Sequence, residues 1–200
     1  QHLLEMVYPH YLAPIPSMTI VQFEPELNES SLAEGYLIEK GSALRSQIGK
    51  GETSVCEYRT AQNTTLWPLE VVGAKYLTTG HAVSNSCKQK ISMARAGLKL
   101  TLKTTAGVDF NELMNLDDLV IYLRGNEETA TFIYEQLIAN TIAVSYQATG
   151  VKKYNKGNPV EPIGFEDDEA LLPFTSQSFS GYRMLQEYFS FPERFRFIKL

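Results

Sequence analysis

Cysteine and histidine are scarce in this sequence, which holds two cysteines and three histidines among 200 residues. His2, His10 and His81 do not stand at the short mutual spacing of a zinc site. Neither Cys56 nor Cys87 belongs to a Cys-x2-Cys pair. Two cysteines cannot build the disulfide framework of a small secreted domain, so reduced thiols are the favoured interpretation and a single bridge is the alternative. We therefore expect no metal site and no cofactor.

Long apolar runs and an excess of basic residues are also missing. No run approaches the roughly 18–20 residues that a membrane-crossing helix needs, and the first residues lack the basic region and cleavage site of a signal peptide. The net charge of −5 argues against a nucleic-acid partner. We expect neither direct membrane insertion nor nucleic-acid binding. Because the chain opens on Gln1 inside a helical pattern, we interpret it as an internal piece of a longer protein.

The sequence also lacks a set of residues that is typical of a catalytic site. The nearest candidate is a polar stretch that holds His81, Ser84, Ser86 and Cys87. A catalytic triad is assembled from distant segments and needs an orienting acid, so an ordinary polar loop is the favoured interpretation. The acidic run Glu166–Glu169 lacks the glycine and the alternation of a calcium loop, which favours a solvated surface. We expect that the protein is not an enzyme.

The patterns that are present predict a fold that is α+β and predominantly β, with sandwich-like or barrel-like sheets and a short C-terminal helix. The clearest local signal is a β–β–α–β unit over residues 98–147. Leucines at 98, 100 and 102 alternate with polar residues, which predicts a half-buried strand. The apolar run 119–123 is typical of a strand buried on both faces.

The helix of this unit has both a start signal and an apolar stripe. Asn126 is the expected N-cap, and two glutamates follow it near the positive end of the helix dipole. The stripe consists of Ala130, Ile133, Tyr134, Leu137 and Ile138. A strand over residues 142–146 completes the unit.

The chain is predicted to fall into three parts. They are residues 1–16 (a helix end and a proline-rich connector), residues 17–150 (a β-rich body) and residues 151–200 (a loop, a short aromatic helix and a terminal strand packed on the same body). Within them we expect a strand over 18–23 and long loops over 79–95 and 148–164.

The C-terminal stretch 179–200 is rich in phenylalanine and tyrosine. It predicts a short helix that Pro192 ends, followed by a strand. Arg183 and Glu187 stand four residues apart, so they can pair along the exposed flank of the helix. The rings are expected to be buried, either in the core or against another protein, and Arg183 is the residue expected to reach outward.

Three stretches together resemble a known family, the type VI secretion baseplate subunit TssF, also called ImpG or VasA. The first is 3–18, with its Pro-His-Tyr-Leu connector, and the second is 56–60 leading on to Leu-Trp-Pro-Leu at 66–69. The third and most specific is 162–173 running into 181–193, Gly-Tyr-Arg-Met-Leu-Gln-Glu-Tyr-Phe-Ser-Phe-Pro-Glu. In order and spacing the matches span nearly the whole chain.

The resemblance implies a non-enzymatic structural component of the baseplate wedge of a contractile injection machine. Implied partners are TssG-like, TssK-like and TssE-like subunits and a second copy of the chain, with a VgrG spike nearby. The implied location is cytoplasmic, at the inner-membrane face of a Gram-negative bacterium. The family offers no catalytic residues. Its recurrent positions, which are either scaffold residues or candidates for an interface, are Tyr182, Arg183, Glu187, Tyr188, Phe191 and Pro192.

The alternative function is a β-sandwich module that binds a ligand such as a carbohydrate. The predicted strand content and the single tryptophan motivate it. Trp67 or Tyr76 would then be an exposed aromatic side chain on which a sugar could stack.

Overall fold

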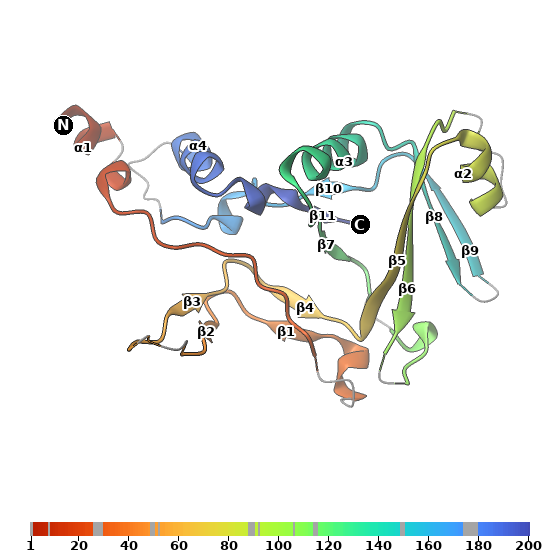
Figure 1. The fold of residues 1–200 in the computed structure, drawn as a ribbon, viewed down its shortest axis with the longest axis horizontal. Coiled ribbons are helices and arrows are strands. Elements are labelled where there is room, and N and C mark those ends of the chain that lie inside the picture. Colours follow the sequence, from red (N-terminus) through yellow and green to blue (C-terminus); the bar gives the residue numbers. More distant parts are fainter. Residues whose placement is uncertain are drawn as a thin grey trace.

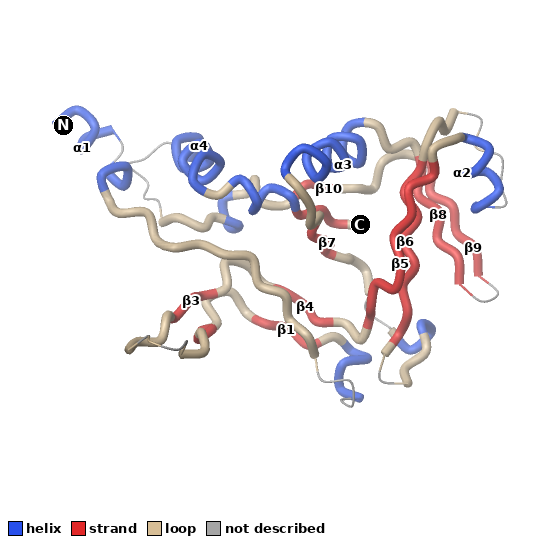
Figure 2. Tube along the Cα trace, viewed as in Figure 1, coloured by secondary structure: helices blue, strands red, loops and turns tan. Residues whose placement is uncertain are grey.

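The computed structural model describes residues 2–7, 9–25, 30–48, 51, 53–87, 91, 93–105, 107–113, 116–148, 151–173 and 180–200. The α+β class with a predominance of strands is confirmed (Figure 2). The α-helices are α1 (His2–Val7), α2 (Gly80–Cys87), α3 (Glu127–Ala139) and α4 (Ser180–Ser190). Short 3-10 helices are η1 (Pro9–Leu12), η2 (Ser30–Glu34), η3 (Phe110–Glu112), η4 (Asp167–Glu169) and η5 (Pro192–Arg196). None of the described helices is long and apolar enough to cross a membrane.

The strands form small antiparallel sheets that do not close into a barrel within the described residues. Four pairs stand alone: β1 (Tyr36–Ile38) with β4 (Thr64–Leu66), β2 (Ala43–Arg45) with β3 (Glu57–Arg59), β5 (Leu69–Leu77) with β6 (Gly97–Thr104), and β8 (Ala143–Ala148) with β9 (Val151–Lys156). One sheet has three strands in the order β10 (Glu161–Pro162), β11 (Phe197–Lys199), β7 (Val120–Tyr122).

Figure 1 shows how these pieces are arranged. Helices α4 and α3, with η5 between them, follow one another along one side of the molecule, and the β1–β4 and β2–β3 pairs lie along the other. The β5–β6 and β8–β9 ribbons lie at the end opposite α1. The chain's accessible surface is 14367 Å², whereas a compact protein of 22.5 kDa would expose about 9,500 Å². The fold is therefore open.

The three-stranded sheet holds the best-packed part of the core. Ile198 in the central strand β11 is 2% exposed, and the ring centroids of Tyr122 and Phe197 lie 4.8 Å apart across the β7–β11 pair. Reciprocal backbone hydrogen bonds between Leu119 and Leu200 extend the pairing beyond β7. The prediction that 119–123 is buried on both faces was wrong, because Val120 is exposed.

The elements of the predicted β–β–α–β unit all form, in the predicted order. Asn126 caps α3 as expected, since its side chain accepts a hydrogen bond from the Thr129 amide. The strands, however, belong to different sheets: β6 pairs with β5, β7 with β11 and β8 with β9. The predicted stripe of α3 is only half-buried apart from Ala130. The pairing of β7 with β11 joins segments that a local pattern does not connect, whereas β8 pairs with the strand that directly follows it.

Three predictions of local structure were wrong. Residues 18–23 form no strand, since no ladder partner lies beside them in the described chain. The expected loop 79–95 contains α2. The Thr79 hydroxyl caps the first turn of this helix, because it accepts a hydrogen bond from the backbone amide of Ala82 at 3.2 Å. The expected loop 148–164 contains β9 and β10. The division of the chain into three parts stays a prediction.

Candidate interface at helix α4

Helix α4 begins at Ser180 and ends at Ser190, where the two residues beyond it cannot continue the helix. Pro192 lacks an amide hydrogen, and a proline disfavours helical geometry in the residue before it. Phe191 accordingly adopts φ −154° and ψ 72°, outside the helical region. The chain then makes η5 before it enters β11, so the predicted strand is shorter than expected and starts at Phe197.

The faces of α4 are reversed relative to an ordinary amphipathic helix. Arg183 and Glu187 are both 0% exposed, whereas Phe189 is 81% exposed. Three further apolar side chains of the helix are exposed: Tyr182, Leu185 and Tyr188. We call these four residues, 182, 185, 188 and 189, the α4 ridge. The expectation that Arg183 reaches outward and the rings lie inside was therefore wrong for this helix.

Glu187 is the centre of a buried charge cluster. Its Oε1 atom accepts hydrogen bonds from the backbone amides of Leu171 and Leu172, both at 3.0 Å. Both carboxylate oxygens lie 3.4 Å from Nη1 of Arg183, and Oε2 is ion-paired with Nη1 of Arg194. A carboxylate buried in this way is satisfied by two amides and two guanidinium groups, which offsets the cost of its desolvation. The predicted Arg183–Glu187 pair exists, but it is buried.

Arg183 and Arg194 also contact the acidic run 166–169, which precedes α4. Nη2 of Arg183 lies 3.3 Å from Oδ1 of Asp167, and Nη2 of Arg194 donates to the Glu169 carbonyl at 2.6 Å. Glu169 in turn accepts from the Gly164 amide at 2.6 Å through Oε2. The acidic run is thus only partly the solvated surface that we expected, because it also anchors α4 and η5.

Burial changes the pKa of the Arg194 guanidinium. Desolvation and the nearby Arg183 charge lower the pKa of Arg194 to about 10, and Glu169 opposes this shift. Arg194 is therefore still cationic at neutral pH and can pair with Glu187. Its guanidinium also stacks 5.0 Å from the centroid of the Phe195 ring.

Gly164 is required where the chain passes this cluster. Its φ is +108°, a conformation that residues with a Cβ rarely adopt. A Cβ at this position would lie 3.3 Å from Nη2 of Arg194. Both the backbone geometry and the close guanidinium therefore select glycine.

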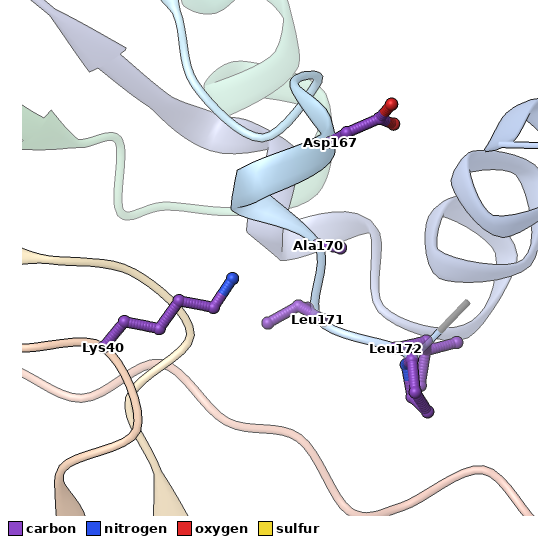
Figure 3. Close-up of a pocket in the computed structure, with 6 residues that line it drawn as sticks. Lys40, Asp167, Ala170, Leu171 and Leu172 are labelled. Atoms are coloured by element: carbon purple, nitrogen blue, oxygen red, sulfur yellow. The ribbon is translucent and has the colours of Figure 1, made fainter. Parts of the chain in front are cut away.

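A shallow cavity of about 360 Å³ lies beside the cluster (Figure 3). Its lining residues are Lys40, Asp167, Ala170, Leu171, Leu172 and Pro173. Lys40 reaches across from the turn after β1, and its Nζ donates to the Asp168 carbonyl. The lining offers one cation, one carboxylate and apolar side chains, and no group of three or more potential metal ligands occurs among the described residues.

The structure places the predicted interface residues in three environments. Tyr182 and Tyr188 are exposed on the ridge, Arg183 and Glu187 are buried beneath it, and Phe191 and Pro192 are half-buried at the helix end. The most exposed ridge residue, Phe189, and the third member of the buried cluster, Arg194, were not among the candidate interface residues. The recurrence of apolar residues at 182, 185 and 189 was a visible helical signal, but it did not reveal which face is buried.

The remaining candidates from the sequence do not converge on a site. His81 lies on α2, where its Nδ1 atom is 3.2 Å from the side-chain Nδ2 atom of Asn85. Tyr76 is exposed and Trp67 is half-buried. They stand near opposite ends of β5, so at roughly 3.3 Å per residue more than about 20 Å of strand separates them. One sugar ring could not stack on both.

An open β-rich fold that turns an apolar helix face outward is typical of a subunit of a larger assembly. Comparisons with known proteins agree with this class. The family model "Type VI secretion system, TssF" matches residues 1–200. The type VI secretion system component TssF1 of Pseudomonas aeruginosa is 45% identical over 201 residues, which cover 99% of this chain and 32% of the relative.

A solved structure gives the same result. A chain in the cryo-electron microscopy structure of the type VI secretion system TssK-TssF-TssG baseplate subcomplex aligns with a TM-score of 0.75 and 27% identity. The alignment covers 99% of this chain and 35% of that chain. The protein belongs to the TssF family, which confirms the resemblance. The chain spans about a third of the length of these relatives.

Proposed function

We propose that this chain is part of a structural, non-enzymatic subunit of the type VI secretion baseplate. The family membership and the likeness to a chain of the TssK-TssF-TssG subcomplex support this role. The observation that carries it is the reversal of α4, which buries Arg183 and Glu187 and exposes Phe189. A helix that exposes rings while charges occupy its core side is built to be covered by another surface.

In this proposal the α4 ridge is an assembly contact. The buried cluster holds α4 rigidly against residues 167–172, so the ridge is presented in a fixed orientation and little entropy is lost on docking. TssG and TssK are the proposed partners, because they accompany the TssF-like chain in the similar complex. TssE, a second copy of the chain and a nearby VgrG spike extend the proposal, with assembly in the cytoplasm at the inner-membrane face.

The test is co-purification of the full-length protein with its own TssG and TssK. Phe189→Glu places a charge at the most exposed position of the ridge and is expected to reduce recovery of at least one partner about tenfold or more. Phe132→Glu is the matched control, since Phe132 is an exposed phenylalanine on α3. It should leave recovery unchanged.

Circular dichroism of both variants separates a lost contact from a lost fold. If the Phe189 variant is folded and retains both partners at the wild-type level, the ridge is not the assembly contact. If the wild-type protein recovers neither TssG nor TssK, the baseplate role itself is contradicted.

A further inference from the structure

The β5–β6 ribbon has an apolar face and a basic face. Residues directly opposite each other in an antiparallel pair share a face. The register pairs Val71 with Leu102, Ala74 with Leu100 and Tyr76 with Leu98, which makes one face apolar. Val71 and Tyr76 are each 56% exposed. A two-stranded ribbon needs cover for such a face, because an isolated pair is marginally stable in water.

The other face carries an excess of positive charge. Lys103 stands opposite Glu70, which balances it, but Lys75 stands directly opposite Lys99. Like charges in this arrangement are destabilising. In the described part of the chain no ion pair is formed by Lys75, Lys99 or Lys103. An anionic side chain beside Lys99, on the outer side of β6, would offset part of this positive charge.

The two outer edges of the ribbon differ. The register of β5 shifts between Val71 and Gly73, and a bulge of this kind disrupts further pairing on its strand. Strand β6 is regular from Gly97 to Thr104 and has no second ladder partner among the described strands. The free edge of β6 is therefore the one that can accept another strand.

We propose that β6 binds an extended segment of a partner protein in which apolar and acidic residues alternate. Such a segment would continue the ladder, extend the apolar face with one set of side chains and pair with the lysines through the other. A second copy of this ribbon does not fit, because its β6 would bring lysines against Lys99 and Lys103. The inference concerns a surface separate from the α4 ridge.

The probe is a synthetic nine-residue peptide of alternating valine and glutamate, tested on the full-length protein by fluorescence anisotropy. We expect saturable binding that weakens as salt is raised. A peptide of alternating valine and lysine should bind at least tenfold more weakly. The valine–glutamate peptide with N-methylated backbone amides should not bind, since it cannot form ladder hydrogen bonds.

The double variant Lys75→Glu and Lys99→Glu reverses the sign of the face while it keeps the same repulsion across the ladder. It should prefer the lysine peptide. Equal binding of both peptides, an unchanged preference in the variant, or full binding of the N-methylated peptide would each overturn the proposal. So would a wild-type protein that binds neither peptide, which is the result expected if the protein's own chain covers β6. None of these readouts requires TssG or TssK.

Discussion

At the scale of single residues, the buried cluster has a positional role. Glu187 lies between two guanidinium groups that would repel each other without it, and it also holds the amides of residues 171 and 172. A buried ion pair contributes little net stability compared with apolar packing, but it requires one geometry. The orientation of α4 that satisfies these contacts is the one in which the ridge is exposed.

Removal of the Glu187 charge should be costly. Glu187→Gln keeps the side-chain shape but removes the buried carboxylate that Arg183 and Arg194 share, and among the described residues it leaves Arg183 with only the exposed Asp167 as an ion-pair partner. The free energy of unfolding should therefore fall by about 3–5 kcal/mol. Urea denaturation measures this loss of unfolding free energy. Glu57→Gln is the matched control, because Glu57 pairs with Arg45 and Arg59 at the surface. Its cost should stay below about 1 kcal/mol. Equal costs at the two sites would show that the cluster is effectively solvated.

The sequence could predict that Arg183 and Glu187 pair, because a spacing of four residues on a helix is sufficient for that. It could not predict that the pair is buried. Burial depends on donors from residues 171 and 172 and on Arg194, and a pattern within α4 contains no information on them. Hydrophobicity alone predicted that the rings are buried, either in the core or against another protein, and it could not decide between the two. In this chain Phe189 is the most exposed residue of the ridge.

At the scale of elements, α3 shows how far local signals reach. Asn126 and the apolar periodicity lie within one short stretch, and the helix forms where they predicted it. Asn126→Ala should lower the free energy of unfolding by about 1 kcal/mol, because the Thr129 amide loses its acceptor. Asn126→Asp should retain most of the stability. Thermal or urea denaturation measures these differences in stability. An alanine variant as stable as the wild type would show that the cap contributes nothing.

Strand β11 is attached to its neighbour by an exposed charge contact. Nζ of Lys199 lies 2.7 Å from Oε2 of Glu161 on β10 and 3.8 Å from Oδ2 of Asp118. The hydrogen bond to Glu161, followed by the charges of Asp118 and Glu161, raises the pKa of Lys199 above 10.5. The folded state thus holds this proton more tightly than the unfolded state. The contribution is fully present below pH 10.5 and is lost as the pH rises through the folded-state pKa.

The corresponding measurement compares the wild type with Lys199→Met. The variant should be less stable at pH 8, and the difference should shrink at pH values well above 10.5. A difference that stays constant across this range would attribute the effect of Lys199 to packing instead of charge.

Three elements were predicted less well than α3. Strand β9 was assigned to a loop because lysines dominate it, yet its pairing with β8 makes it extended. Helix α2 was missed because serine and asparagine are weak helix formers, and the Thr79 cap and the buried Val83 compensate. The residues 18–23 have strand-forming side chains but no neighbouring strand among the described residues. For residues 18–23 the missing information is the absence of a neighbouring strand, whereas for β9 and α2 the composition concealed a local hairpin and a local cap.

At the scale of the whole molecule, the open fold leaves less surface for unfolding to expose. An unfolded chain of 22.5 kDa exposes roughly 33,000 Å². Because the folded chain already exposes 14367 Å², the surface gained on unfolding is about a fifth smaller than for a compact protein. The urea m-value of the 200-residue chain should be lower by about the same fraction. A value typical of a compact protein of this length would contradict the open arrangement.

The order of strands in the central sheet also constrains when the protein can fold during its synthesis. Strand β11 lies between β10 and β7, so among the described strands β7 has no partner until residues 197–199 have left the ribosome. At about 5–20 residues per second, the roughly 75 residues that separate β7 from β11 take about 4–15 s to translate. During that interval the apolar run around β7 is available to chaperones and to misfolding. We therefore expect the yield of folded protein to depend on the speed of translation through residues 123–196.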